Sequence, residues 1–247
     1  MGSTKEWMME LEDGRMIQWM RENYNIPEEV EIDEDYPGFG GMAAMYEHEH
    51  EREEYEAHMK WYEEHPYLET YSIFTENLKS LKVMINQRSN PFDDKTIHRM
   101  AYAHAVTLFE AMVGDIIKTT LLSFPHLMNR FIGKLSEDKS LKFTVKEIAE
   151  LGINGIVMNI INAQTFHNPL TVKNYVNLVT GEVLPDTHMA KIKKVIEIRH
   201  DFVHRNGKTV TGEYHSVDTA LIIGSIEIIE KFANDVFETL SKAMSEE

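Results

Sequence analysis

Apolar side chains recur every three or four residues over long stretches of this chain, a spacing that places them on one face of an α-helix. The clearest stretch is 94–124, which has acidic residues at its start, keeps the helical period throughout and stops at Pro125. A second apolar stretch with the same period runs to Leu240 near the end of the chain. The sequence therefore predicts an all-α fold, built as a helical bundle.

Proline, glycine and capping residues divide the remaining sequence into further helices. Thr144 and Glu147, three residues apart, form a capping box, and Ser216 is expected to cap the last helix. The helix that starts at Asp186 is expected to end at Asn206-Gly207, because glycine favours the residue after a helix end. The other expected helices cover residues 42–65, 67–87, 144–163 and 170–179.

Acidic residues are concentrated at the N-terminal end. Residues 1–70 hold 20 acidic and five basic residues, a net charge of −15, whereas the rest of the chain has a net charge of −1. The strongest break in composition lies at residues 31–41, where acids, a proline and three glycines stop a helix. We expect an acidic, mostly helical extension over residues 1–66 and a helical domain over residues 67–247. Apolar residues of the first 20 positions are expected to pack on the rest of the protein, with packing on a partner as the alternative: Trp7, Met8, Leu11, Met16, Ile17, Trp19 and Met20.

Several classes of protein are excluded or unsupported. The chain has no cysteine, which excludes disulfides, cysteine-ligated zinc, iron–sulfur clusters and a thiol nucleophile. It contains no P-loop, GxGxxG or GxSxG motif, so kinase, dinucleotide-dependent and serine-hydrolase functions have no support. No signal peptide and no run of about 18 apolar residues is found, so we expect a cytoplasmic protein without membrane contact. His50, Glu54 and His58 share a helical face but lack an HExxH motif, and we interpret them as solvated, with no metal or cofactor expected.

Residues 198–207, IRHDFVHRNG, carry the candidate chemistry. On a helix, His200 and His204 are four apart and share a face. Arg199 and His204 are five apart and point about 140° away from each other around the axis. One helix therefore cannot aim Arg199 and His204 at a single atom unless its last turn unwinds or a second copy of the chain contributes.

This set of residues suits a phosphate substrate. Arginine is a planar phosphate clamp and histidine acts as an acid or base, so the set is competent to cleave RNA: the 2′-hydroxyl attacks the neighbouring phosphorus while arginine stabilises the charge. No metal ion is needed for that route. Two copies packed around a twofold axis would place two of each residue around one cleft, which suits a polyanion. Basic and polar residues near this segment are the candidate RNA-binding positions: Lys194, Arg205, Asn206 and Lys208.

The segment resembles the HEPN superfamily. The resemblance rests on Arg199-x4-His204 with His200 directly after the arginine and Arg205-Asn206-Gly207 behind it, close to the RHxxVHRNG form of bacterial defence and toxin HEPN proteins. It implies an all-α bundle that dimerises with the two motifs at the interface. It also implies a metal-independent endoribonuclease that leaves 2′,3′-cyclic phosphate and 5′-hydroxyl ends.

The resemblance also implies roles for single residues. Arg199 and His204 would be the catalytic pair, His200 an auxiliary polar residue, and an acid of the long second helix, Glu110 or Asp115, would join them. The implied partners are RNA, a second copy of the chain and an antitoxin or regulatory protein, in phage defence or growth arrest. The alternative is a catalytically inert HEPN module that dimerises or binds a partner protein or nucleotide, with its arginine and histidine paired to nearby acids.

Overall fold

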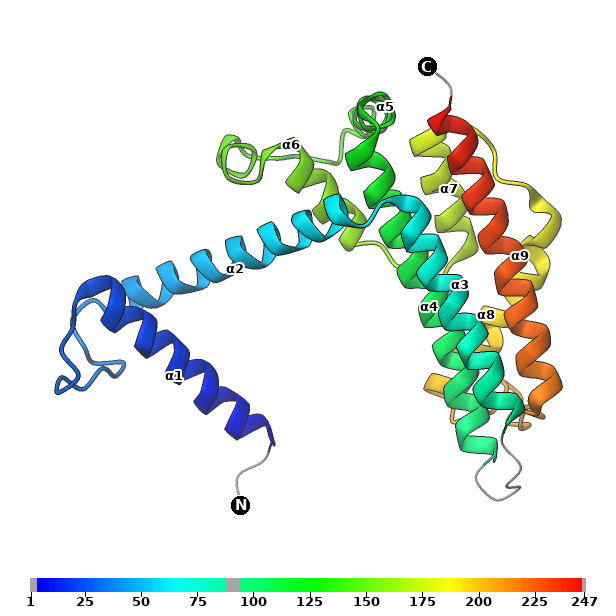
Figure 1. The fold of residues 1–247 in the computed structure, drawn as a ribbon, viewed down its shortest axis with the longest axis horizontal. Helices are drawn as coiled ribbons and strands as arrows, with labels where there is room; N and C mark the ends of the chain where they lie inside the picture. Colours follow the sequence, from blue (N-terminus) through cyan, green and yellow to red (C-terminus); the bar gives the residue numbers. More distant parts are fainter. Residues whose placement is uncertain (1–3, 88–93, 246–247) are drawn as a thin grey trace. The chain divides into compact units, whose positions relative to one another are not determined.

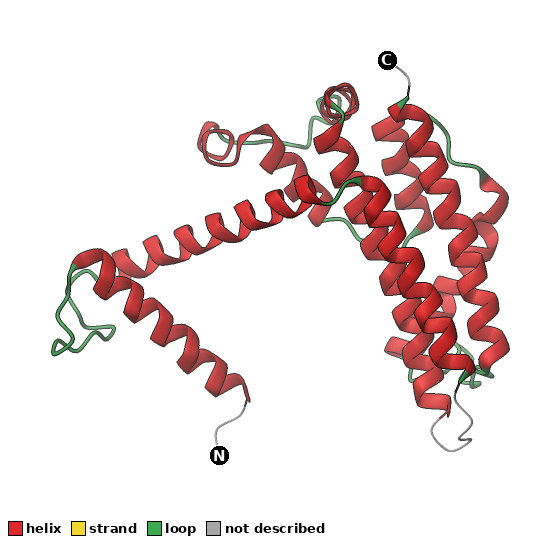
Figure 2. Cartoon of the chain, viewed as in Figure 1, coloured by secondary structure: helices red, strands yellow, loops and turns green. Residues whose placement is uncertain are grey.

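The computed structural model describes residues 4–87 and 94–245, and all of the regular structure in these ranges is helical (Figures 1 and 2). The prediction of an all-α fold is confirmed. The elements are α1 (Thr4–Tyr24), α2 (Phe39–Glu64), α3 (Tyr67–Asn86), α4 (Asp94–Ser123), α5 (Pro125–Leu135), α6 (Val145–Asn162), α7 (Pro169–Thr180), the short 3₁₀ helix η1 (Asp186–His188), α8 (Met189–His204) and α9 (Thr219–Met244).

The chain divides into two compact units, Met1–Trp61 and Tyr62–Glu247, with the boundary inside α2. In the first unit, α1 and the start of α2 share a small core of Met20, Ile32 and Met42. Trp19 packs at the edge of this core and donates a hydrogen bond from Nε1 to Glu49 at 2.9 Å. Of the seven apolar residues expected to pack, Met16, Ile17, Trp19 and Met20 therefore do so within the first unit. The side chains of Trp7, Met8 and Leu11 lie outside the described residues.

In the second unit, α3, α4, α8 and α9 form a bundle in which α4 contacts the other three helices (Figure 1). Its interior is apolar and aromatic: the buried rings of Phe109 on α4 and Phe232 on α9 lie 5.6 Å apart between centroids. Tyr102 on α4 meets Phe202 on α8 edge to face at 5.0 Å and donates a hydrogen bond to the carbonyl of Val195 at 3.1 Å. These contacts fix α8 against the N-terminal half of α4.

Several local signals in the sequence match the structure. The capping box is present: the Thr144 hydroxyl accepts from the Glu147 amide at 3.1 Å, and the Glu147 carboxylate accepts from the Thr144 amide at 2.7 Å. Helix α7 ends at Gly181, whose φ of +78° lies in the left-handed region that suits glycine. Within the described ranges, no helix combines the length and apolar character needed to cross a bilayer.

One expectation about helix ends is confirmed and extended, and two are corrected. Pro125 marks the end of α4, as expected, and it also opens α5, because proline has no amide hydrogen to lose at the first helical position. Asp186 starts a 3₁₀ turn, and the α-helix begins at Met189. Asp218 rather than Ser216 caps the last helix, since its carboxylate accepts from the Leu221 amide at 2.8 Å.

Candidate active site at the end of helix α8

Helix α8 stays regular through His204 and then turns sharply. Asn206 and Gly207 have φ values of +52° and +83°, so the chain reverses through two left-handed residues. The amides of Arg205 and Gly207 both donate to the carbonyl of Asp201, at 3.1 and 2.8 Å. This turn places the residues after α8 back against its last turn.

The carboxylate of Asp201 holds this turn in place. Asp201 is only 8% exposed, and it accepts hydrogen bonds from Arg205 Nη1 and from His215 Nε2, the latter at 2.8 Å. The hydrogen bonds from His215 and Arg205 keep the pKa of Asp201 below its usual range. The charge of Asp201 is therefore used to join the end of α8 to the segment that leads into α9.

Arg99, near the start of α4, belongs to the same group of residues. Its Nη1 donates to the side-chain oxygen of Asn206 at 3.2 Å, and its guanidinium packs so closely on Gly207 that a Cβ there would lie 2.9 Å from Cζ. Arg99 was not singled out from the sequence. His215 was likewise missed, because no pattern in the sequence connects either residue to α8.

Three side chains near the end of α8 take no part in the contacts that hold this turn: Arg199, His200 and His204. The rings of His200 and His204 lie 4.6 Å apart between centroids, and both side chains are exposed. Arg199 is half-buried, and its Nε is buried without a hydrogen-bond partner. Across residues 4–87 and 94–245, none of the three forms an ion pair with a carboxylate.

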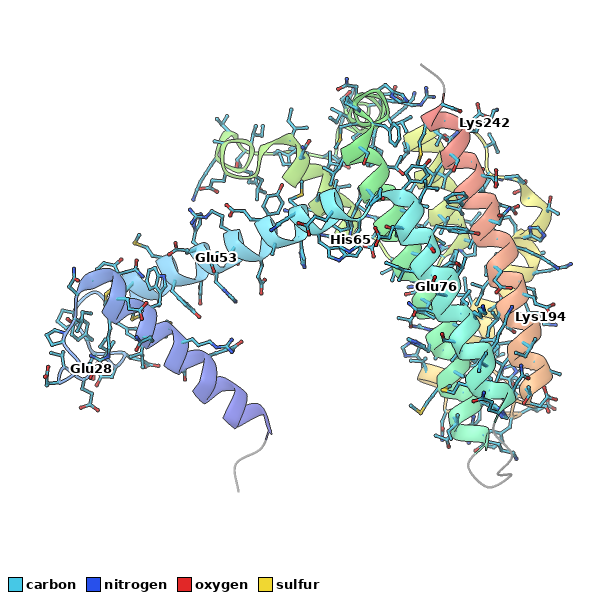
Figure 3. The ribbon with its side chains drawn as sticks, viewed as in Figure 1. Glu28, Glu53, His65, Glu76, Lys194 and Lys242 are labelled. Atoms are coloured by element: carbon cyan, nitrogen blue, oxygen red, sulfur yellow. The ribbon has the colours of Figure 1, made fainter. Side chains whose placement is uncertain are left out.

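The other candidate RNA-binding residues have different surroundings. Arg205 is tied to Asp201, and Asn206 accepts from Arg99. Lys208 is exposed, with its Nζ 5.2 Å from the centre of the Tyr214 ring. Lys194 is exposed on α8 (Figure 3), about 15 Å along the helix from His204 by the helical rise.

The structure does not bring Glu110 or Asp115 to this group within one chain. The two acids lie about 16 and 24 Å along α4 from Arg99 by the helical rise. Glu110 Oε1 lies 3.8 Å from His167 Nδ1. Asp115 accepts from the Tyr62 hydroxyl at 3.1 Å and lies 3.6 Å from the ammonium of Lys118. Asp115, Tyr62 and Lys118 therefore form a polar cluster that is separate from the end of α8. Burial raises the pKa of Tyr62 and lowers the pKa of Lys118 in this cluster.

The described residues contain no group of three or more His, Asp or Glu side chains arranged to hold a metal ion. His50 and Glu54, two of the three residues expected to share a helical face, lie 3.5 Å apart between Nε2 and Oε1, and both side chains are more than half exposed. An exposed pair of this kind contributes little to stability.

Comparison with known proteins finds no family model that matches the chain, and no curated protein or solved structure that is similar to it. The functional argument therefore rests on the residues at the end of α8 and on their surroundings.

Proposed function

We propose that the protein is a metal-independent endoribonuclease of the HEPN type, with Arg199 and His204 as its catalytic pair. The observation that carries the proposal is Arg199, a half-buried residue whose Nε has no hydrogen-bond partner, on the same last turns of α8 as the exposed His200 and His204. A buried N–H donor without a hydrogen-bond partner is costly in free energy. The planar fork of arginine matches the geometry of a phosphate, which would supply the missing acceptor.

The proposed reaction uses only side chains and the RNA itself. A histidine takes the proton of the 2′-hydroxyl, whose oxygen forms a bond to the adjacent phosphorus, and the bond from phosphorus to the 5′-oxygen breaks. A second histidine gives a proton to that leaving oxygen, while Arg199 stabilises the charge that develops on the phosphate. The products are a 2′,3′-cyclic phosphate and a 5′-hydroxyl, and DNA is resistant because it lacks the 2′-hydroxyl.

The alternative of an inert binding module expects Arg199 and His204 to be neutralised by neighbouring acids. Asp201 lies between them in sequence, yet it is paired with Arg205 and His215 instead. This arrangement favours the catalytic proposal, since Asp201 supports the local backbone without occupying the proposed reactive groups. A cytoplasmic role in defence or growth arrest, with an antitoxin or regulatory partner, is part of the same proposal.

The test is cleavage of total RNA and transfer RNA by the purified protein in excess EDTA. Arg199→Ala and His204→Ala are each expected to slow cleavage by about 100-fold or more, as loss of a group that stabilises the transition state does. Arg15→Ala and His58→Ala are matched controls, because both side chains are exposed in the first unit; both should cleave at the parent rate.

Analysis of the products completes the test. The proposal is supported if the RNA products of the wild-type protein end in a cyclic phosphate and if Arg199→Ala and His204→Ala form no such products. Cleavage that EDTA abolishes, or that persists in both variants, contradicts it. A folded dimeric protein that cleaves no RNA favours the binding module.

A further inference from the structure

Tyr214 is a large aromatic residue whose side chain is exposed to solvent. It lies in the segment between α8 and α9, and 61% of its surface is exposed. The backbone around it is ordered: Tyr214 pairs with Lys208 in an antiparallel bridge, the Thr209 amide donates to the Glu213 carbonyl at 2.7 Å, and the His215 amide donates to the Gly207 carbonyl at 3.0 Å. The exposed ring is therefore presented on a fixed turn.

Two cations lie over this ring in cation–π contacts. Lys208 Nζ is 5.2 Å from the ring centre, and Arg99 Cζ is 5.9 Å from it. Arg99 is held in that position by Asn206 and by its close packing on Gly207. Neither cation forms an ion pair with a carboxylate in the described part of the chain. A solvent-exposed aromatic ring in contact with cations that form no ion pair has the chemistry of a site for a base and its phosphates.

The ring belongs to the same end of the bundle as the proposed catalytic residues. Tyr214 directly precedes His215, whose Nε2 donates to Asp201, and Asp201 directly follows His200. The segment that carries Tyr214 is therefore joined through Asp201 to the last turns of α8, which carry Arg199 and His204.

We infer that Tyr214 is a stacking platform for an unpaired base of single-stranded RNA, with Arg99 and Lys208 holding adjacent phosphates. The inference rests on the proposed ribonuclease function and specifies its substrate. Bases stack on aromatic side chains with little preference for sequence, whereas the bases of a duplex are already paired and stacked. The substrate class is therefore single-stranded RNA, or a loop of a folded RNA.

The experiment measures RNA binding by fluorescence anisotropy in full-length His204→Ala protein, in which cleavage is suppressed. The probes are a short labelled oligouridylate, the same oligonucleotide with one abasic position, and a duplex RNA of equal length. Tyr214→Ala is expected to weaken binding of the oligouridylate by about tenfold or more. Tyr214→Trp should retain binding because it keeps a flat ring. Val210→Ala is the matched control, since Val210 is 81% exposed in the same segment.

The abasic probe separates stacking from damage to the fold. Removal of a base should weaken binding to protein that carries Tyr214 and have little further effect on Tyr214→Ala. Equal affinity of Tyr214→Ala and its parent, or equal affinity for duplex and single strand, overturns the inference. If binding depends on Tyr214 but the wild-type protein does not cleave, the proposed function fails and the platform stands. If no RNA binds, both are overturned.

Discussion

At the scale of single residues, Gly207 joins the backbone turn after α8 to Arg99. Its φ of +83° is costly for a residue with a side chain, and a Cβ would lie 2.9 Å from the Arg99 guanidinium. Gly207→Ala is therefore expected to lower the free energy of unfolding by about 1–2 kcal/mol, measured by urea denaturation. Gly224→Ala is the control: it lies in α9 with no atom within 4 Å of its Cβ, so it should raise stability by about 0.5–1 kcal/mol. Equal stability of Gly207→Ala and the parent would contradict the left-handed conformation of Gly207 and its close contact with Arg99.

Asp201 makes stability depend on pH. Hydrogen bonds from His215 and Arg205 lower the pKa of its carboxyl in the folded state. A group of this kind stabilises the fold above its unfolded pKa, near 4, and this contribution is lost as the pH falls through the lower folded value. We expect the urea midpoint of the parent to drop over this acidic range, and that of Asp201→Asn to drop less. Parallel pH profiles of the two proteins would show that Asp201 does not act in this way.

The sequence predicts the part of the candidate site that lies within one short segment. Arg199, His200 and His204 are neighbours along a helix, so their relative directions follow from the helical repeat. Arg99 and Asn206 are 107 positions apart, and their contact arises from packing of α4 against the end of α8. No periodicity along a chain reports which ends of two helices meet, and Arg99, Tyr214 and His215 were therefore not identified.

At the scale of elements, the start of α9 offers a direct comparison between two capping residues. The Asp218 carboxylate accepts from the Leu221 amide at 2.8 Å, so Asp218→Ala is expected to cost about 1 kcal/mol of stability. Ser216→Ala should change stability by less than about 0.5 kcal/mol, as an exposed substitution does. Urea denaturation of both variants measures the difference. A larger loss for Ser216→Ala would move the start of the helix to the position that the sequence predicted.

Most of the helices, but not all of their ends, could be predicted from sequence. Long apolar periods identified α3, α4 and α9, because burial of one face drives their packing. The end signals were ambiguous: Pro125 stops one helix and starts the next, and Ser216 and Asp218 are both good capping residues. Buried Val217 lies between these two caps, so packing of the chain onto the bundle determines which cap is used.

At the scale of the whole molecule, the distribution of charge matters more than its sum. The chain carries a net charge of −16, of which −15 belongs to residues 1–70. The proposed RNA site lies entirely in the second unit. Its residues are Arg99, Arg199, His200, His204 and Lys208. Residues 71–247, which make up most of this unit, have a net charge of only −1, so a local group of cations there is able to attract a phosphate despite the acidity of the complete chain.

The regular helix through His204 leads to a prediction about assembly. Arg199 and His204 remain about 140° apart around α8, so one helix does not direct both at one phosphate. If Arg199 of one copy acts with His204 of another, a mixture of inactive Arg199→Ala and His204→Ala proteins regains activity after subunit exchange. Half of the dimers are then mixed, each with one intact site, and activity should reach about a quarter of the wild-type value. His204→Ala mixed with the double variant is the control and should stay inactive. Absence of recovery in the first mixture, with exchange verified, would show that each chain supplies a complete site.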